Sequence, residues 1–118
     1  MKIAALKSLL APKVYPDTSS EVALQNRIEE ILQEADIDHK REVELGPGDR
    51  IDFLAGTVGI EIKLQAPVTK VMRQLHRYAQ SGLIEELLLV TTHPRLSLVP
   101  KKFNGKPIRV LVLITTIL

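Results

Sequence analysis

Apolar residues recur at helical spacing in the first third of the chain. After residue 20, apolar side chains three or four positions apart share one face of a helix: Leu24, Ile28, Ile31, Leu32 and Ala35. The run Thr18-Ser19-Ser20 precedes them with residues that cap helices, so the pattern predicts a helix from there to about Asp36. Residues 3–10 also alternate at roughly helical spacing and stop before Pro12, which indicates a short helix or arm.

Strand patterns dominate after residue 40. Alternating or continuous apolar runs predict five strands, at 41–45, 50–55, 58–64, 86–92 and 108–116. The last two runs are apolar almost throughout, which is typical of strands covered on both faces. Between the third and fourth strands, Pro67 precedes a helical stretch from about Val68 to Ser81, with Gly82 expected as its C-terminal cap.

This order of elements predicts an α/β fold in which helices flank a mixed central β-sheet. A helix is followed by a three-stranded meander, a second helix and two further strands, α-β-β-β-α-β-β in order. At 118 residues the chain has the length of a single domain. We expect residues 18–116 to form its core and residues 1–17 to form an amino-terminal arm or short helix.

Alternation gives the second and third strands an apolar and a polar face. In the second strand, Ile51 and Phe53 are expected on the apolar face and Asp52 on the opposite one. In the third strand, Glu61 and Lys63 lie opposite a set of four apolar positions, Val58, Ile60, Ile62 and Leu64.

A tight turn determines how these two strands pair. Gly56-Thr57 suits a type II′ hairpin, because glycine supplies the positive φ angle at the first central position. With these two residues as the loop, Asp52 stands directly across from Glu61, and Lys63 follows on the same face. Directly opposed like charges are destabilising, so a hairpin with only a structural role would not place two acids there.

A divalent cation resolves this conflict. Asp52 and Glu61 can share an oxygen-ligated ion such as Mg²⁺, which keeps several waters and asks for only one or two protein carboxylates. Lys63 is placed where its charge can act on an activated water or a phosphate oxygen. The alternative is a solvent-exposed strand face with incidental charges, because a Glu-x-Lys tripeptide is common.

The first predicted helix carries an acid in an unusual place. On a helical wheel Glu21 falls in the middle of the apolar stripe, and a carboxylate that faces the core is costly unless something compensates it. Thr18-x-x-Glu21 also fits a capping box, which would employ Glu21 locally. The two interpretations are compatible.

The second predicted helix carries polar residues beside its apolar stripe. Gln74 and Tyr78, four positions apart, flank the stripe together, and Lys70 and Arg77 lie just beyond them. The alternative is a rim position for Tyr78 and an ordinary solvated face for the basic residues.

Composition excludes several classes of protein. The chain has no cysteine, which excludes disulfide frameworks and thiolate metal sites. Its longest apolar run is far shorter than the ~20 residues of a membrane span, so we expect a cytoplasmic protein without a membrane segment. A net charge of +2 is only mildly basic, and two Tyr and two Phe are too few for an aromatic platform on single-stranded nucleic acid.

The ordered combination of these residues resembles the PD-(D/E)XK nuclease superfamily, which includes restriction endonucleases, Holliday junction resolvases and RecB-type nucleases. The pattern of that superfamily is an acid on a first helix, then an aspartate, then (D/E)-x-K on a hairpin. The matching residues here are Glu21, Asp52 and Glu61-Ile62-Lys63. Ile51 stands in place of the proline of the family name, at a position that varies.

The resemblance extends over residues 18–92 and includes the second helix, where Gln74-x-x-x-Tyr78 is similar to the Gln/Tyr motif of RecB-type members. It implies a restriction-endonuclease-like core. It also implies metal-dependent hydrolysis of phosphodiester bonds in DNA.

The resemblance assigns roles to individual residues. The implied catalytic groups are Glu21, Asp52, Glu61, Lys63 and Gln74. Mg²⁺, for which Mn²⁺ substitutes, is expected on Asp52, Glu61 and the backbone carbonyl of Ile62. Lys63 would orient or deprotonate the attacking water. The DNA backbone is expected at Lys70, Arg73, Arg77 and Tyr78.

The sequence says less about the substrate. A small chain without a recognition motif favours a structure-specific or weakly sequence-specific endonuclease, of Holliday junction or viral type. Cleavage of both strands requires two active sites, so we expect a homodimer, with the apolar ends of the chain as candidate interfaces and no organic cofactor. The alternatives are a non-cleaving or assembly-dependent DNA-binding subunit on the same fold, and a structural α/β protein with an accidental motif.

Overall fold

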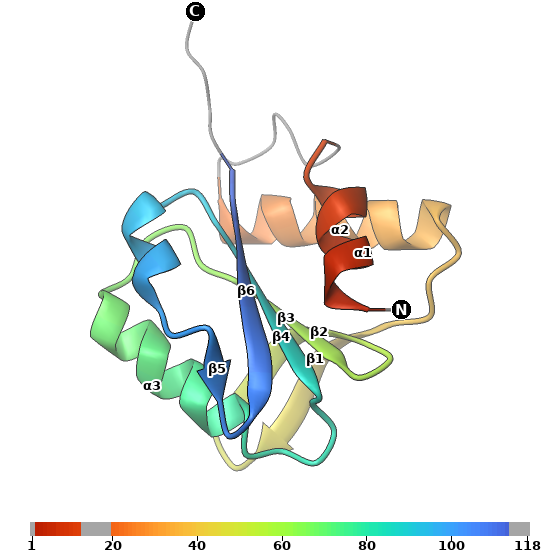
Figure 1. Ribbon diagram of the computed structural model, residues 1–118. Helices are drawn as coiled ribbons and strands as arrows, with labels where there is room; N and C mark the ends of the chain where they lie inside the picture. Colours follow the sequence, from red (N-terminus) through yellow and green to blue (C-terminus); the bar gives the residue numbers. More distant parts are fainter. Residues whose placement is uncertain (1, 13–19, 114–118) are drawn as a thin grey trace, which may run out of the picture.

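The chain folds into a mixed six-stranded sheet with helices on both faces (Figure 1). The structure is a computed structural model that describes residues 2–12 and 20–113. In chain order, its elements are α1 (Ile3–Leu10), α2 (Glu21–Glu34), β1 (Lys40–Gly46), β2 (Asp49–Ala55), β3 (Val58–Ile62), α3 (Val68–Tyr78), β4 (Glu86–Thr91), the 3₁₀ helix η1 (Pro94–Leu98), β5 (Lys102–Phe103) and β6 (Lys106–Val112). The predicted α/β class is confirmed.

The sheet has the order β1-β2-β3-β4-β6-β5. The first three strands form an antiparallel meander, β3, β4 and β6 run parallel to one another, and β5 pairs antiparallel with β6. The strand β4 lies inside the sheet and is buried from Leu87 to Thr91, as its continuous apolar run predicts. None of the described helices is long and apolar enough to cross a membrane.

Several elements differ from their predicted forms: β3 ends at Ile62 and not at Leu64, β6 begins at Lys106 and ends at Val112, and α3 and β5 differ more. The helix α3 ends at Tyr78 and not near Ser81, because the next turn tightens: the N–H of Gln80 bonds the carbonyl of Arg77, three residues back. Ala79 is therefore the C-cap, and the expected cap at Gly82 is wrong. The strand β5 was not predicted, because two residues are too short for a periodic pattern.

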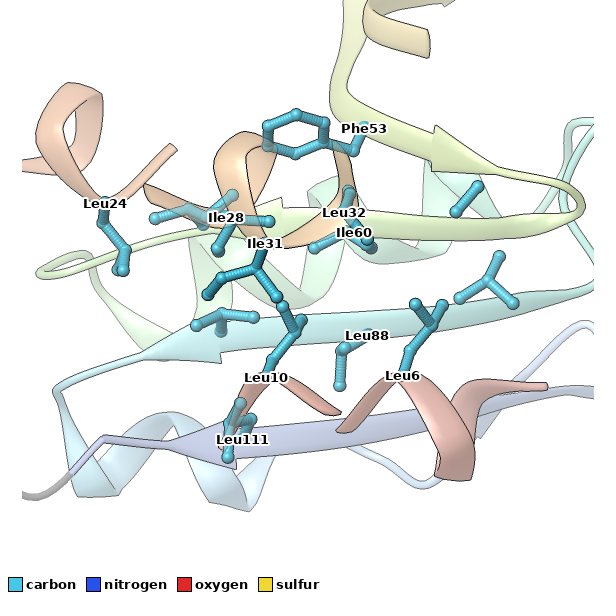
Figure 2. Close-up of a cluster of buried hydrophobic side chains, with 14 of the residues drawn as sticks. Leu6, Leu10, Leu24, Ile28, Ile31, Leu32, Phe53, Ile60, Leu88 and Leu111 are labelled. Atoms are coloured by element: carbon cyan, nitrogen blue, oxygen red, sulfur yellow. The ribbon is translucent and has the colours of Figure 1, made fainter. Parts of the chain in front are cut away.

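The first hydrophobic cluster lies between the sheet and the helices α1 and α2 (Figure 2). Ile3, Leu6 and Leu10 of α1 are at most 3% exposed, so α1 is the predicted short helix and belongs to the core. Its own chain covers its apolar face, so the predicted role of this segment as an interface element would have to use its other residues. The other candidate interface, at residues 114–118, lies outside the described residues.

The second cluster lies between the sheet, α3 and η1, and Gly59 of β3 allows it to pack closely. A Cβ atom on Gly59 would lie 2.5 Å from Ile51 Cδ1, 2.8 Å from Ile84 Cδ1 and 3.1 Å from Leu87 Cδ2. All three contacted side chains are at most 1% exposed, so they have little room to shift.

We therefore expect Gly59→Ala to lower the free energy of unfolding by about 1–3 kcal/mol. The matched control is Gly82→Ala, since a Cβ there meets nothing within 4 Å. Urea denaturation of the two variants measures the difference. Equal stability of both variants would show that the second cluster is less tightly packed than described.

Candidate active site

The hairpin between β2 and β3 has the predicted register. Phe53 pairs with Ile60, Leu54 with Gly59 and Ala55 with Val58, as the Gly56-Thr57 turn predicts. Gly56 has a φ of +62° and Thr57 has no positive φ, as a type II′ turn requires. The predicted register is confirmed for these pairs, and the two acids occupy the positions directly beyond the last of them.

The backbone pairing between β2 and β3 ends at Phe53. Beyond it, side chains accept the hydrogen bonds across the hairpin. The N–H of Asp52 donates to Glu61 Oε1 at 3.3 Å, and the N–H of Ile62 donates to Asp52 Oδ2 at 2.8 Å. Each carboxylate therefore accepts a bond from the partner strand's backbone where a carbonyl would otherwise accept it. The hairpin opens here, with both acids between its strands.

The packing of β2 also corrects a prediction. Phe53 packs in the cluster under α1 and α2, whereas Ile51 packs in the cluster under α3. The expectation that Ile51 and Phe53 share one face is wrong. The backbone departs from regular alternation here: Glu42 of β1, between the pairs Arg41–Phe53 and Val43–Ile51, has a φ of +55°, and Val43 packs in the cluster under α3 together with Ile51.

Lys63 completes a compact charged group with the two acids. Its Nζ lies 3.3 Å from Glu61 Oε2, and its side chain is 26% exposed. Glu61 is only 2% exposed. At the opened end of the hairpin, the carboxylates of Glu61 and Asp52 thus lie close to the partly exposed ammonium group of Lys63.

Tyr78 lies behind this group and not at the surface. Its side chain is 0% exposed, and its hydroxyl donates to the carbonyl of Arg50 at 2.8 Å and lies 3.5 Å from Glu61 Oε2. The predicted contact of Tyr78 with DNA is therefore wrong. Val71 and Leu75 share the buried side of α3 with Tyr78, which places its ring in the core and leaves only its hydroxyl to find polar partners.

The protonation of the two acids follows from their burial. Burial raises the pKa of Glu61 to about 8, the charge of Asp52 adds to this rise, and Lys63 opposes it. Burial also raises the pKa of Asp52, against the hydrogen bond from Ile62 and the charge of Lys63. The pair therefore retains a proton near neutral pH unless a further positive charge is supplied.

The carboxylates of Asp52 and Glu61 suit Mg²⁺ or Mn²⁺ better than a metal ion whose ligands all come from the protein. Within residues 2–12 and 20–113, no group of three or more His, Cys, Asp and Glu side chains is placed to hold a metal ion. Two carboxylates suffice for Mg²⁺, which keeps several of its waters. The Ile62 carbonyl lies on the edge of β3 that faces β2, because its N–H bonds Asp52 and both groups of one strand residue point to the same side.

A pocket of about 380 Å³ opens beside this group. Six of the predicted site residues line it: Glu21, Lys63, Lys70, Arg73, Gln74 and Arg77. Lys70 and Arg73 are exposed, and Arg77 Nε lies 2.9 Å from Asp49 Oδ1. Lys63 thus belongs both to the charged group and to the lining of the pocket, whereas Asp52 and Glu61 are not among the lining residues.

Glu21 is the first residue of α2 and borders the pocket half-buried. The Ser20 hydroxyl caps the helix by accepting from the N–H of Ala23 at 3.0 Å, and Thr18 lies outside the described residues. The capping-box interpretation is wrong, because with Ser20 as the N-cap Glu21 holds the first helical position and not the third. Its charge raises the pKa of Asp52, but no hydrogen bond joins the two described side chains.

Gln25 is a site residue that sequence analysis missed. Its Nε2 donates to Asp52 Oδ1 at 3.2 Å. The signal was its position four residues after Glu21, on the same face of α2. Without the structure, nothing indicated that this face reaches β2.

Comparison with known proteins does not assign a family or a function to the chain. No family model, curated protein or solved structure matches the chain. The function must therefore be argued from the site itself.

Proposed function

We propose that the protein is a metal-dependent DNA endonuclease of the PD-(D/E)XK type. The observation that carries this proposal is the convergence of Asp52, Glu61 and Lys63 at the opened end of one hairpin. The adjoining pocket, lined by basic residues of α3, supports a polyanionic substrate.

Each residue of the site has a proposed role that follows from its chemistry. Asp52, Glu61 and the Ile62 carbonyl would hold Mg²⁺ or Mn²⁺. The chemistry that the ion supplies when bound is polarisation of the scissile phosphate and activation of a water molecule. Lys63 offsets the negative charge that develops on the phosphate and orients the attacking water.

Other residues act on the substrate and on the shape of the site. Lys70, Arg73 and Arg77 line the pocket and supply positive charge for the DNA backbone. Glu21 and Gln74 border the same pocket, where each can hold a water molecule near the reacting phosphate. Tyr78 stays protonated, because burial and the nearby Glu61 raise its pKa, and it holds the inner side of Glu61 in place.

These contacts favour recognition of DNA shape over DNA sequence. The basic pocket residues make contacts to phosphate groups, which position a duplex but carry no sequence information. A structure-specific substrate such as a four-way junction suits this surface, and cleavage of both strands requires a homodimer. We also propose that the protein is cytoplasmic.

A cleavage panel tests the proposed function. Single-stranded, duplex, flap and four-way junction DNA are each incubated with the protein in Mg²⁺, in Mn²⁺ and in a chelator. We expect cleavage in either metal ion and none in the chelator, with branched substrates cut fastest. Absence of cleavage in every arm would overturn the proposed activity, and Mn²⁺ binding without cleavage would favour an assembly-dependent subunit.

A further inference from the structure

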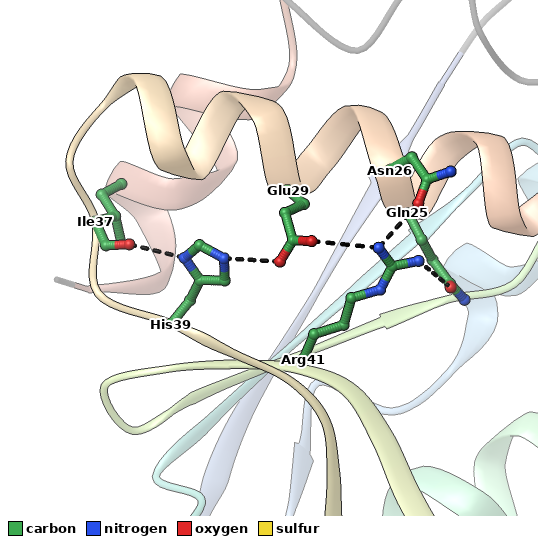
Figure 3. Close-up of polar contacts among 6 residues, drawn as sticks. All are labelled: Gln25, Asn26, Glu29, Ile37, His39 and Arg41. Atoms are coloured by element: carbon green, nitrogen blue, oxygen red, sulfur yellow. Dashed lines mark hydrogen bonds and ion pairs between the residues drawn. The ribbon is translucent and has the colours of Figure 1, made fainter.

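The side chain of Arg41 in β1 connects the sheet to α2 (Figure 3). Its guanidinium lies among three side chains of that helix. Nη1 donates to Asn26 Oδ1 at 2.8 Å and to Glu29 Oε1 at 3.4 Å, and Nη2 donates to Gln25 Oε1 at 3.1 Å. The guanidinium carbon also lies 5.6 Å from the centre of the Phe53 ring. Several fixed partners thus hold Arg41 in one orientation.

Glu29 is held from its other side by His39, as Figure 3 shows. His39 Nε2 lies 3.0 Å from Glu29 Oε2, and its Nδ1 lies 2.8 Å from the carbonyl oxygen of Ile37. Both oxygens of Glu29 are therefore engaged, one by His39 and one by Arg41. This chain of contacts fixes α2 against β1.

The amide of Gln25 has a defined orientation as a result. A guanidinium only donates hydrogen bonds and an ionised carboxylate only accepts them. Gln25 Oε1 must therefore face Arg41, which turns Nε2 towards Asp52 Oδ1 at 3.2 Å. The reversed amide would lose both bonds.

Asp52 is then held by both of its oxygens. Oδ2 accepts from the Ile62 N–H, and Oδ1 accepts from Gln25. We propose that Gln25, oriented by Arg41, is a positioning residue that fixes the Asp52 carboxylate for metal binding. This inference rests on the proposed function, since it assigns a task to Gln25 only if Asp52 binds a metal ion.

The alternative is that these contacts only attach α2 to the sheet. Comparing a variant of Asn26 with a variant of Gln25 distinguishes attachment from positioning. Asn26 accepts the shortest of the three bonds from Arg41, and among the described residues no hydrogen bond joins it to Asp52. Gln25→Met removes the donor to Asp52 and nearly preserves the length of the side chain. Asn26→Ala removes a bond to the same guanidinium and leaves the Gln25 amide in place.

Mn²⁺ titration calorimetry on the full chain tests the inference in four variants: Gln25→Met, Arg41→Met, the double variant and Asn26→Ala. Residues behind a metal ligand typically change metal affinity by about 10- to 100-fold. We expect a loss of that size in Gln25→Met, a smaller or equal loss in Arg41→Met, and less than a twofold change in Asn26→Ala. Because Arg41 acts through Gln25, the double variant should bind no more weakly than Gln25→Met alone.

Each result has a distinct meaning. Wild-type affinity in Gln25→Met, or equal losses in Gln25→Met and Asn26→Ala, would overturn the positioning role while the proposed function stands. Additive losses in the double variant would show that Arg41 does not act through Gln25. Absence of Mn²⁺ binding by the wild type would overturn the proposed function and this inference with it. Thermal unfolding without metal confirms that every variant is folded at the titration temperature.

Discussion

Lys63→Met is expected to lower the rate of Mg²⁺-dependent DNA cleavage by about 10²- to 10⁴-fold, the range for loss of one general acid–base or electrostatic group. Methionine fills similar space but carries no charge, so neither the attacking water nor the phosphate is stabilised. Lys63 is not among the proposed metal ligands, so Mn²⁺ binding should survive. A fluorescent junction substrate under single-turnover conditions measures the rate.

Two further variants separate the possible causes of this loss. Asp52→Asn should lose both cleavage and Mn²⁺ binding, because it removes a ligand charge. Lys101→Met removes an exposed lysine outside the pocket and should cleave at the wild-type rate. Wild-type cleavage by Lys63→Met would exclude Lys63 from the chemistry.

The stability of the metal-free protein is expected to fall as the pH rises from about 4.5 to about 8. The pKa of Glu61 is about 8 in the folded chain, against an ordinary value of 4.5. Between these values the folded state binds more protons than the unfolded state, so the free energy of unfolding decreases with increasing pH. The contribution of Glu61 is complete below pH 4.5 and is lost through pH 8, by roughly 3–5 kcal/mol.

Glu61→Gln should remove the part of this pH dependence that Glu61 contributes, because an amide keeps the shape of the side chain and does not ionise, whereas Asp52, whose pKa burial also raises, still titrates. The difference in unfolding free energy between wild type and variant, measured in urea with a chelator, isolates Glu61 from other titrating groups. At pH 8 the variant should be the more stable of the two. Glu34→Gln, at an exposed position of α2, is the control and should follow the wild type. A constant difference across this pH range would show that Glu61 is already ionised in the metal-free fold.

The register of the central hairpin could be predicted because it depends on local chemistry. Gly56, at a turn position that requires positive φ, determines which residues oppose each other from Ala55–Val58 to Phe53–Ile60, and this places Asp52 and Glu61 at the next positions. Helix α2 and the buried strand β4 were likewise visible as apolar patterns. These features need no knowledge of distant parts of the chain.

Other features depend on contacts between elements that no local pattern contains. Ile51 packs under α3 where the β1–β2 ladder is irregular at Glu42, and Tyr78 is buried because its side of α3 packs on the sheet. Gln25 reaches Asp52 across 27 residues of sequence, through the packing of α2 against the sheet. Local periodicity shows which face of a helix is apolar, but it does not show which strand that face covers.

Thermal unfolding with and without Mn²⁺ at pH 8 tests most directly whether Asp52 and Glu61 form a divalent cation site. A ligand that binds only the folded state at about 100 times its dissociation constant stabilises that state by about 2.7 kcal/mol. The melting temperature of the wild type should therefore rise by at least about 5 °C in Mn²⁺, and that of Asp52→Asn should not change. A wild type that melts at the same temperature in Mn²⁺ and in chelator, or an equal rise in both proteins, would contradict the assignment of a metal site to this pair.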